Sequence, residues 1–142
     1  YKQVDLCEIV KKTFRFPSNK LAYVAPTLGL TPKETHEGHE LWVKCMAGDE
    51  SAWVDMARYN VQDVSTTEEL YDRLLPWIHS HPHFGLFVDE SRPVCGRCGG
   101  TKLQRRGMAT TSVGAYQRFQ FQGCGGWSRG GRRVNGVDVR PV

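Results

Sequence analysis

The feature that most constrains the fold of this chain is an incomplete repeat of cysteine-containing turns. Cys95 and Cys98 form a C-x-x-C turn that is followed by two glycines, and further along Cys124 is again followed by two glycines. Two C-x-x-C turns would supply the four tetrahedral thiolates of a structural zinc site. The second turn has Phe121 where the repeat requires its first cysteine. The pattern therefore predicts a small metal-binding module with three of the four thiolates present.

The sequence leaves three alternatives for the fourth zinc ligand. A histidine completes the site, and His81 and His83 are the nearest in the sequence. Otherwise a water molecule fills the fourth position and the site is weaker, or the metal has been lost and Phe121 packs in its place. We expect structural zinc bound by the three cysteines.

Charge divides the chain into two parts. Residues 1–80 contain nine Lys or Arg and twelve Asp or Glu, a balance of −3. Residues 91–142 contain ten Lys or Arg and a single acid, a balance of +9. A basic, arginine-rich segment is typical of proteins that bind nucleic acid. A solubilising tail is the alternative, but the aromatic residues among these arginines favour nucleic acid.

Arginine side chains bind phosphates and stack on bases, and aromatic rings offer platforms for single strands. The expected partner is therefore nucleic acid, in particular single-stranded DNA, read with little sequence specificity. The residues expected to bind it are Arg105, Arg106, Arg118, Trp127, Arg129, Arg132 and Arg133. Trp127 has an alternative role as the core anchor of a small β module. The pair Gly130-Gly131 predicts a mobile segment over residues 128–133.

The cysteine count bears on the compartment. Five cysteines, an odd number, do not suggest a disulfide framework, and free thiols fit a reducing compartment. No stretch approaches the roughly 20 apolar residues of a membrane span, and no signal peptide is visible. We therefore expect a cytoplasmic protein with no membrane partner.

Periodicity predicts a helical part, a linker and a β module. Residues 1–80 read as four or five short helices without strands, which is typical of the helical half of an α/β domain. Asp49 is expected to cap a helix whose inner face carries Trp53, Met56, Ala57, Asn60 and Val64. A capping box at 65–68 opens or restarts a helix. Residues 81–93 read as a linker. Residues 94–142 read as a β module with a strand over 116–121, too small to fold without a metal or a docking partner.

Tyr59 and Asp63 are a second chemical signal. They are four residues apart, so they lie on one face of a helix, beside the stripe formed by Trp53 and Val64. On the wall of a cleft, this carboxylate can hold a divalent cation and the tyrosine hydroxyl can orient a water molecule. The alternative is a half-buried tyrosine beside a solvated aspartate.

Several short motifs follow one another in a particular order. They are Asp5-Leu6, Lys20-Leu21, Val24-Ala25, Leu28-Gly29-Leu30, Lys33, Tyr59-Asn60, Asp63-Val64 and Leu70-Tyr71. In this order they resemble the DnaQ-like, ribonuclease H-like 3′–5′ exonucleases, in the branch with tyrosine in the last motif. That branch includes phage exonucleases with a C-terminal zinc ribbon, which the stretches Arg105-Arg106-Gly107 and Cys124 to Arg129 also resemble.

The resemblance implies an α/β fold of the ribonuclease H type, represented mainly by its helical C-terminal half, plus a small zinc-ribbon-like β module. It implies metal-dependent 3′–5′ exonucleolysis of DNA or RNA, in which four carboxylates bind two magnesium or manganese ions. By resemblance, Tyr59 orients the attacking water and Asp63 is a metal ligand. A phage-encoded protein of this kind would act in the host cytoplasm.

Three of the family's four metal-binding carboxylates are absent. The Asp-x-Glu of the first motif and the aspartate of the second motif have no match, and Asp5 matches a later position. One carboxylate cannot hold a pair of metal ions, so the chain's own activity stays open. Either another polypeptide supplies the N-terminal half, or the chain is a non-catalytic module that binds nucleic acid or docks on a partner. A structural zinc protein without nucleic acid fits poorly with the +9 balance.

Overall fold

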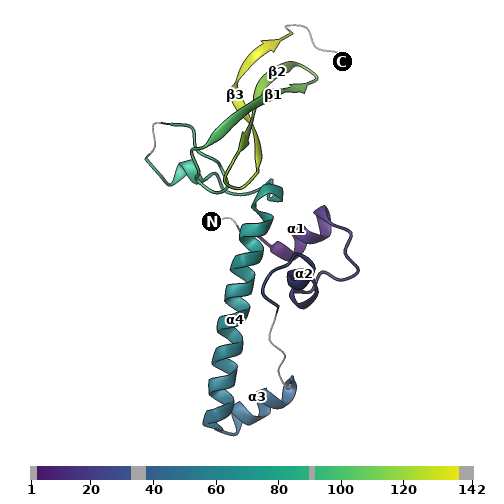
Figure 1. Ribbon diagram of the computed structural model, residues 1–142, viewed down its shortest axis with the longest axis vertical. Helices are drawn as coiled ribbons and strands as arrows, with labels where there is room; N and C mark the ends of the chain where they lie inside the picture. The colour runs from purple at the N-terminus through teal and green to yellow at the C-terminus, as the bar shows by residue number, and fades with distance from the viewer. Residues whose placement is uncertain (1–2, 33–37, 90–91, 138–142) are drawn as a thin grey trace. The chain divides into compact units, whose positions relative to one another are not determined.

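The structure is a computed structural model that describes residues 3–32, 38–89 and 92–137 of the 142-residue chain. It contains two compact units, Asp5–Leu74 and a second formed chiefly by the chain from Leu75 onward. The first is helical, and the second contains a three-stranded antiparallel sheet (Figure 1). The chain thus has both α and β elements, as expected. Lys33 and the last five residues of the expected β module lie outside the described residues.

Short-range hydrogen bonds set the ends of the helices. The helices are α1 (Leu6–Thr13), α2 (Leu21–Thr27), α3 (His39–Met46) and α4 (Glu50–Leu74). A side-chain oxygen of Asp5 accepts a hydrogen bond from the backbone N–H of Glu8 at 3.0 Å and so caps α1. Gly29, at φ +72°, follows the end of α2 in the left-handed conformation that terminates helices. Asp49 caps α4 as predicted, since its Oδ1 accepts from the N–H of Ser51 at 2.9 Å.

Helix α4 runs without interruption through the segment where a new helix was predicted. The prediction of a helix start at 65–68 is therefore wrong. The hydroxyl groups of Ser65 and Thr67 donate to the carbonyl oxygens of Val61 and Asp63, at 3.1 and 2.7 Å. Serine and threonine inside a helix bond to the preceding turn in this way instead of capping a new one.

The buried face of α4 contains Met56, as predicted, but it excludes the other residues that were predicted there. Its buried residues are Ala52, Met56, Thr66, Leu70 and Leu74. Trp53 and Val64, which were predicted on the inner face, are 55% and 68% exposed. The reason is that α3 packs on the stripe containing Ala52 and Met56, where it contributes Leu41 and the buried Cys45.

The C-terminal half of α4 is tied to α2 by polar side chains. Glu69 accepts hydrogen bonds from the backbone N–H and the hydroxyl of Thr31, at 2.9 and 2.8 Å. One turn later, Arg73 donates to the carbonyl oxygen of Leu28 at 3.0 Å. These bonds fix the end of α2 and the loop after it. None of the described helices is both long enough and apolar enough to cross a membrane.

The second unit begins with two short 3-10 helices, η1 (Leu75–Trp77) and η2 (Phe84–Leu86). Helix η2 lies in the stretch predicted as a linker. The backbone N–H of Phe84 donates to the carbonyl oxygen of Gly96 at 2.8 Å, which joins η2 to the first cysteine turn.

The sheet is a meander of β1 (Leu103–Thr111), β2 (Gly114–Phe121) and β3 (Trp127–Gly136). Strand β2 contains the strand predicted over 116–121. Strand β3 contains residues 128–133, which were predicted to be mobile. That prediction is wrong, because pairing of Phe119 with Ser128 and of Tyr116 with Arg133 holds this segment in the sheet despite its two glycines.

Candidate metal centre and nucleic-acid interface

The two turns that the sequence pairs have the same backbone hydrogen bonds. In each, the first residue donates its N–H to the carbonyl five residues later and accepts from the N–H four residues later. These distances are 2.8 and 3.0 Å in the turn that starts at Cys95, and 3.0 and 2.8 Å in the turn that starts at Phe121. Gly99 and Gly125 provide the left-handed fifth residue, with φ of +70° and +72°. Phe121 therefore occupies the position that corresponds to Cys95.

The sulfur atoms of Cys95, Cys98 and Cys124 come together as predicted. All three lie within 4.8 Å of one another, and the Sγ atoms of Cys95 and Cys124 are 3.6 Å apart. In a tetrahedral site with Zn–S bonds of about 2.3 Å, neighbouring sulfurs are separated by about 3.8 Å. The cluster thus matches three corners of such a site, and these cysteines can hold a metal ion.

The surroundings of the three thiols make them electrostatically different. Burial raises the pKa of the Cys124 thiol to about 11, although the backbone N–H of Gly126 donates to its sulfur at 3.4 Å. Partial burial also raises the pKa of Cys98, but hydrogen bonds from the Gly100 N–H and from the two other thiols outweigh it. The pKa of Cys98 is therefore held below the ordinary cysteine value. Cys98 therefore provides a thiolate more readily than Cys124.

Histidine is not the fourth ligand in this structure. No further His, Cys, Asp or Glu among residues 3–32, 38–89 and 92–137 joins the three-sulfur group. The Nδ1 atom of His81 lies 2.6 Å from the carbonyl oxygen of Pro82, and the Nδ1 atom of His83 accepts from the N–H of Gly85 at 3.1 Å. Two alternatives remain, a water molecule as fourth ligand or a site without metal. Phe121 is only 5% exposed, so it packs at the position of the missing cysteine in either case.

Tyr59 and Asp63 lie on α4, where the sequence placed them. Tyr59 is half-buried and packs against the cluster that α3 and α4 share. Asp63 is also half-buried. In the part of the chain that the structure describes, Asp63 does not belong to any group of three or more metal-ligand side chains.

Two arginines stack on aromatic rings on one face of the sheet. Residues that pair across antiparallel strands share a face, and the pairing of Gln120 with Trp127 and of Arg118 with Arg129 defines it. We call it the Trp127 face. The guanidinium carbon of Arg118 is 4.6 Å from the centre of the Trp127 ring, and that of Arg129 is 4.4 Å from the centre of the Tyr116 ring. Trp127 is 43% exposed, so it is not the core anchor that was considered as an alternative.

Two of the remaining predicted arginines share this face, Arg106 through its bond to Gln104, which pairs with Gln120, and Arg133 as the partner of Tyr116. The other two do not. Arg105 pairs with Phe119 on the opposite side of the sheet, which we call the Phe119 face, and together with Arg132 it lines a cavity there. The Nε atom of Arg106 donates to the side-chain oxygen of Gln104 at 3.0 Å. The side chain of Arg133 covers two glycines of the sheet, because a Cβ at Gly114 would lie 2.7 Å from it. The seven predicted residues are therefore distributed over both faces.

Arg97, which sequence reasoning did not select, has a positioning role. Its Nε donates to the carbonyl oxygen of Ile78 at 3.0 Å and its Nη1 to that of Trp127 at 3.2 Å. It therefore joins the first cysteine turn to the start of β3. The sequence signal for this role was the position of Arg97 inside the C-x-x-C turn, because side chains there lie close to the second turn.

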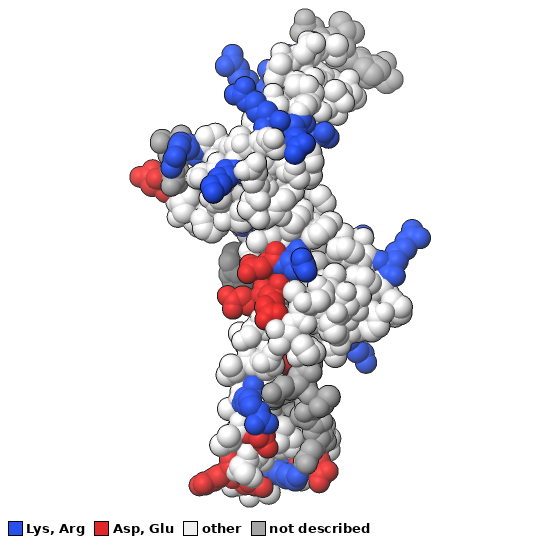
Figure 2. Space-filling model, viewed as in Figure 1, with Lys and Arg blue, Asp and Glu red and all other residues white. Residues whose placement is uncertain are grey.

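The charge of residues 92–137 is strongly positive. Residues 92–137 contain nine Lys or Arg and no Asp or Glu, so no ion pair within this stretch can neutralise its arginines. On the face of the molecule seen in Figure 2, Lys and Arg side chains gather over the strands. A surface of this kind attracts polyanions.

Comparisons with protein families, with curated proteins and with solved structures find no match to this chain. The functional conclusion therefore depends on the chemistry of the two faces of the sheet and of the cysteine cluster.

Proposed function

We propose that the C-terminal unit binds single-stranded nucleic acid on the Trp127 face of its sheet. The observation that carries this proposal is the pair of stacks, Arg118 on Trp127 and Arg129 on Tyr116, in a stretch with no acidic residue. Stacking holds each guanidinium flat. The Nε atom of Arg118 donates to the carbonyl oxygen of Arg106 at 3.0 Å, and the terminal N–H groups of both arginines can donate to phosphate oxygens. The exposed part of the Trp127 ring offers a surface on which a base can stack.

Zinc is the proposed metal of the three-cysteine cluster. Thiolate ligands favour zinc and other soft metals, and the sulfur spacing fits the zinc tetrahedron. A bound ion would join the turn before β1 to the turn between β2 and β3. It would thereby hold in place the strands that carry the two stacks. Such a cross-link suits a unit with few buried residues, because small modules depend on metals for stability.

The proposal is tested by fluorescence anisotropy with the whole chain and a labelled single strand of about 12 nucleotides. We expect binding at about 50 mM salt that weakens steeply towards about 200 mM, because counterions are released when phosphates are neutralised. Strands of different base sequence should bind with similar affinity, since the stacks contact no hydrogen-bonding edge of a base. Absence of binding at the lower salt concentration would contradict the proposal. DNA and RNA strands are compared in the same assay.

A second candidate function is that the chain forms one part of a 3′–5′ exonuclease of the DnaQ-like type. The observation that favours it is an apolar surface on the helical unit, which a sheet of an α/β domain would cover. The exposed apolar residues of α3 and α4 are Trp42, Val43, Met46, Trp53, Val54, Val61 and Val64. In this candidate, Asp63 would ligate one catalytic metal and Tyr59 would orient the water. The other three carboxylates would come from a polypeptide segment outside these 142 residues.

This second candidate predicts that the chain alone does not degrade labelled strands with magnesium or manganese, because one carboxylate cannot hold two ions. Adding a polypeptide that carries Asp-x-Glu on a strand should restore degradation from the 3′ end. In that mixture Asp63→Ala should abolish degradation, and Tyr59→Phe should reduce it. Equal nuclease rates for wild type and Asp63→Ala would rule out the metal-ligand role. If no mixture degrades the strand, the exonuclease candidate is wrong, and the proposal of strand binding is unaffected.

A further inference from the structure

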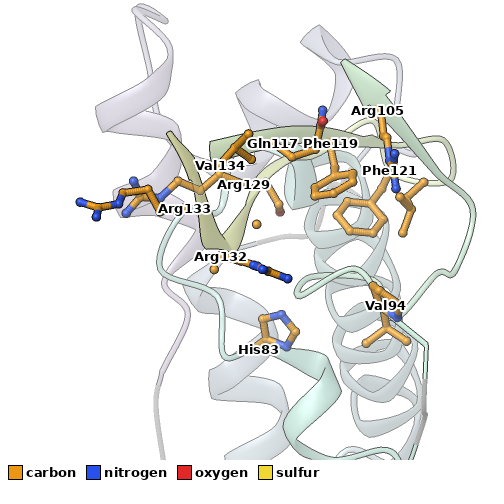
Figure 3. A pocket seen from close by; sticks show the side chains of 15 residues that line it. His83, Val94, Arg105, Gln117, Phe119, Phe121, Arg129, Arg132, Arg133 and Val134 are labelled. Carbon is orange, nitrogen blue, oxygen red and sulfur yellow. The ribbon is translucent and has the colours of Figure 1, made fainter. Parts of the chain in front are cut away.

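A cavity of about 790 Å³ lies on the Phe119 face, and its lining includes Arg129, which belongs to one of the two arginine stacks. It is bounded by the sheet and by the chain segments before β1, including His83 and Val94 (Figure 3). Cavities that hold small organic ligands have about 300–1,000 Å³. The volume is therefore sufficient for a ligand larger than a single inorganic ion.

The alternation of β2 and β3 builds the walls. Phe119 and Phe121 point to the same side of β2 and form an aromatic wall. Gly130 lies two residues after Ser128, the partner of Phe119, and keeps the space above that ring open, since its Cβ would lie 3.6 Å from the Cε2 atom of Phe119. The backbone of Gly130 is not in the left-handed conformation. Glycine at this position therefore matters because it has no side chain to fill the cavity.

Cationic and hydrogen-bonding groups line the other side. Figure 3 shows the guanidinium of Arg132 between His83 and the two phenyl rings, with Arg105 beside Phe119. The Nδ1 atom of His83 accepts from Gly85, so its other ring nitrogen carries the proton of the neutral imidazole. Gly96 leaves room for this ring, because a Cβ there would lie 2.7 Å from the Cδ2 atom of His83.

The lining selects a class of ligand. It contains arginine and histidine but no Asp or Glu, which excludes a cation and favours an anion. Inorganic phosphate alone would make no contact with the rings of Phe119 and Phe121. A flat aromatic group joined to a phosphate satisfies both walls, because the ring can stack on Phe119 while the phosphate accepts from Arg105 and Arg132.

We propose that this cavity binds one nucleotide unit of the strand held on the Trp127 face, with its base against Phe119 and its phosphate between Arg105 and Arg132. This inference rests on the proposed function. Strand β3 is an edge of the sheet, and both Arg129, which stacks on Tyr116, and Arg132 line the cavity. A strand passing over this edge meets cations on both sides. The cavity thus accommodates a terminal or unstacked nucleotide.

The test is an NMR titration of the whole ¹⁵N-labelled chain with deoxyadenosine monophosphate, and separately with inorganic phosphate. The nucleotide should shift the backbone amide signals of Gln117, Phe119 and Gly130, whereas phosphate should shift them much less. Gly130→Leu fills the cavity without removing a charge and should weaken nucleotide binding about tenfold or more. Gly123→Leu is the matched control, since a Cβ there meets no atom within 4 Å and Gly123 does not line the cavity.

The same variants are measured with a strand of about 12 nucleotides and with a strand that carries one abasic residue at its end. Gly130→Leu should weaken binding of the intact strand and leave the abasic strand unchanged. Equal shifts with phosphate and nucleotide, or equal strand affinities for Gly130→Leu and wild type, would overturn the nucleotide site while strand binding stands. Nucleotide binding without any strand binding would overturn both the proposed function and this inference.

Discussion

Replacing Phe121 by cysteine is expected to tighten zinc binding about a hundredfold and to destabilise the metal-free C-terminal unit. Four-ligand structural zinc sites bind with apparent free energies of about 10–16 kcal/mol, so one added thiolate corresponds to about 3 kcal/mol. The turn at Phe121 already has the hydrogen bonds of the turn at Cys95, so a cysteine there needs no change of backbone. Without metal, loss of the buried phenyl ring costs about 3–5 kcal/mol, as for large-to-small core substitutions.

Phe121→Cys is expected to strengthen zinc binding and to weaken the stability of the metal-free unit, and these opposite effects make the experiment specific. Zinc affinity is measured by competition with a coloured chelator, zinc content by elemental analysis, and stability by thermal unfolding with and without EDTA. Phe121→Ala is the control, because it removes the ring without adding a ligand. It should be less stable than wild type in both conditions and gain no zinc affinity. If Phe121→Cys and wild type have the same zinc content and the same resistance to chelators, Phe121 does not stand at a ligand position.

The sequence predicted the cysteine cluster because most of its geometry is local. A C-x-x-C turn needs only six residues, and its repetition at Phe121 is visible in the shared glycines. The meeting of the two turns follows from the pairing of strands β1 and β2, of which only β2 was predicted, over residues 116–121. The fourth ligand was not predictable, because it depends on the path of residues 79–83. That path is set by contacts such as the hydrogen bond from the N–H of Gly85 to His83, and no sequence pattern predicts such a contact.

The helical unit shows a different limit. Asp49 and Gly29 act within one turn of the chain, so the cap of α4 and the end of α2 were predictable. The buried face of α4 was not, because Trp53 and Val64 are as apolar as the residues that are buried. Which stripe is covered depends on where α3 packs, and α3 covers the stripe of Met56. Periodicity gives the helix, while tertiary packing chooses its face.

The arginines show the same limit in the sheet. Composition and clustering indicated a nucleic-acid partner, but the side of the sheet on which each arginine lies depends on register. Register shifts between Tyr116 and Arg118 change the alternation on β3, so spacing along the sequence does not give the face. Arg129 stacks on Tyr116 and also lines the cavity, whereas Arg132, three residues later, lines the cavity without joining either stack.

Removing both stacked guanidinium groups, as in Arg118→Ala/Arg129→Ala, is expected to weaken single-stranded DNA binding roughly 10- to 100-fold at low salt. The slope of log affinity against log salt should become shallower by about 1.4, because each neutralised phosphate of a single strand contributes about 0.7. Trp127→Ala should also lower the affinity, by about 1–3 kcal/mol of lost base stacking, but should leave the slope unchanged. Affinity and slope together therefore separate phosphate contacts from stacking on this face.

The matched control lowers the net charge equally without touching the sheet. Lys11 and Lys12 are exposed on α1, where they pair with Glu8, so Lys11→Ala/Lys12→Ala removes two positive charges from the helical unit. Their removal should change affinity and slope far less than the loss of Arg118 and Arg129. An equal effect of the two double variants would mean that net charge alone attracts the strand. An unchanged slope in Arg118→Ala/Arg129→Ala would mean that the stacked arginines do not contact phosphates. Either result removes the Trp127 face as the binding surface, because that proposal requires these two guanidinium groups to meet the strand directly.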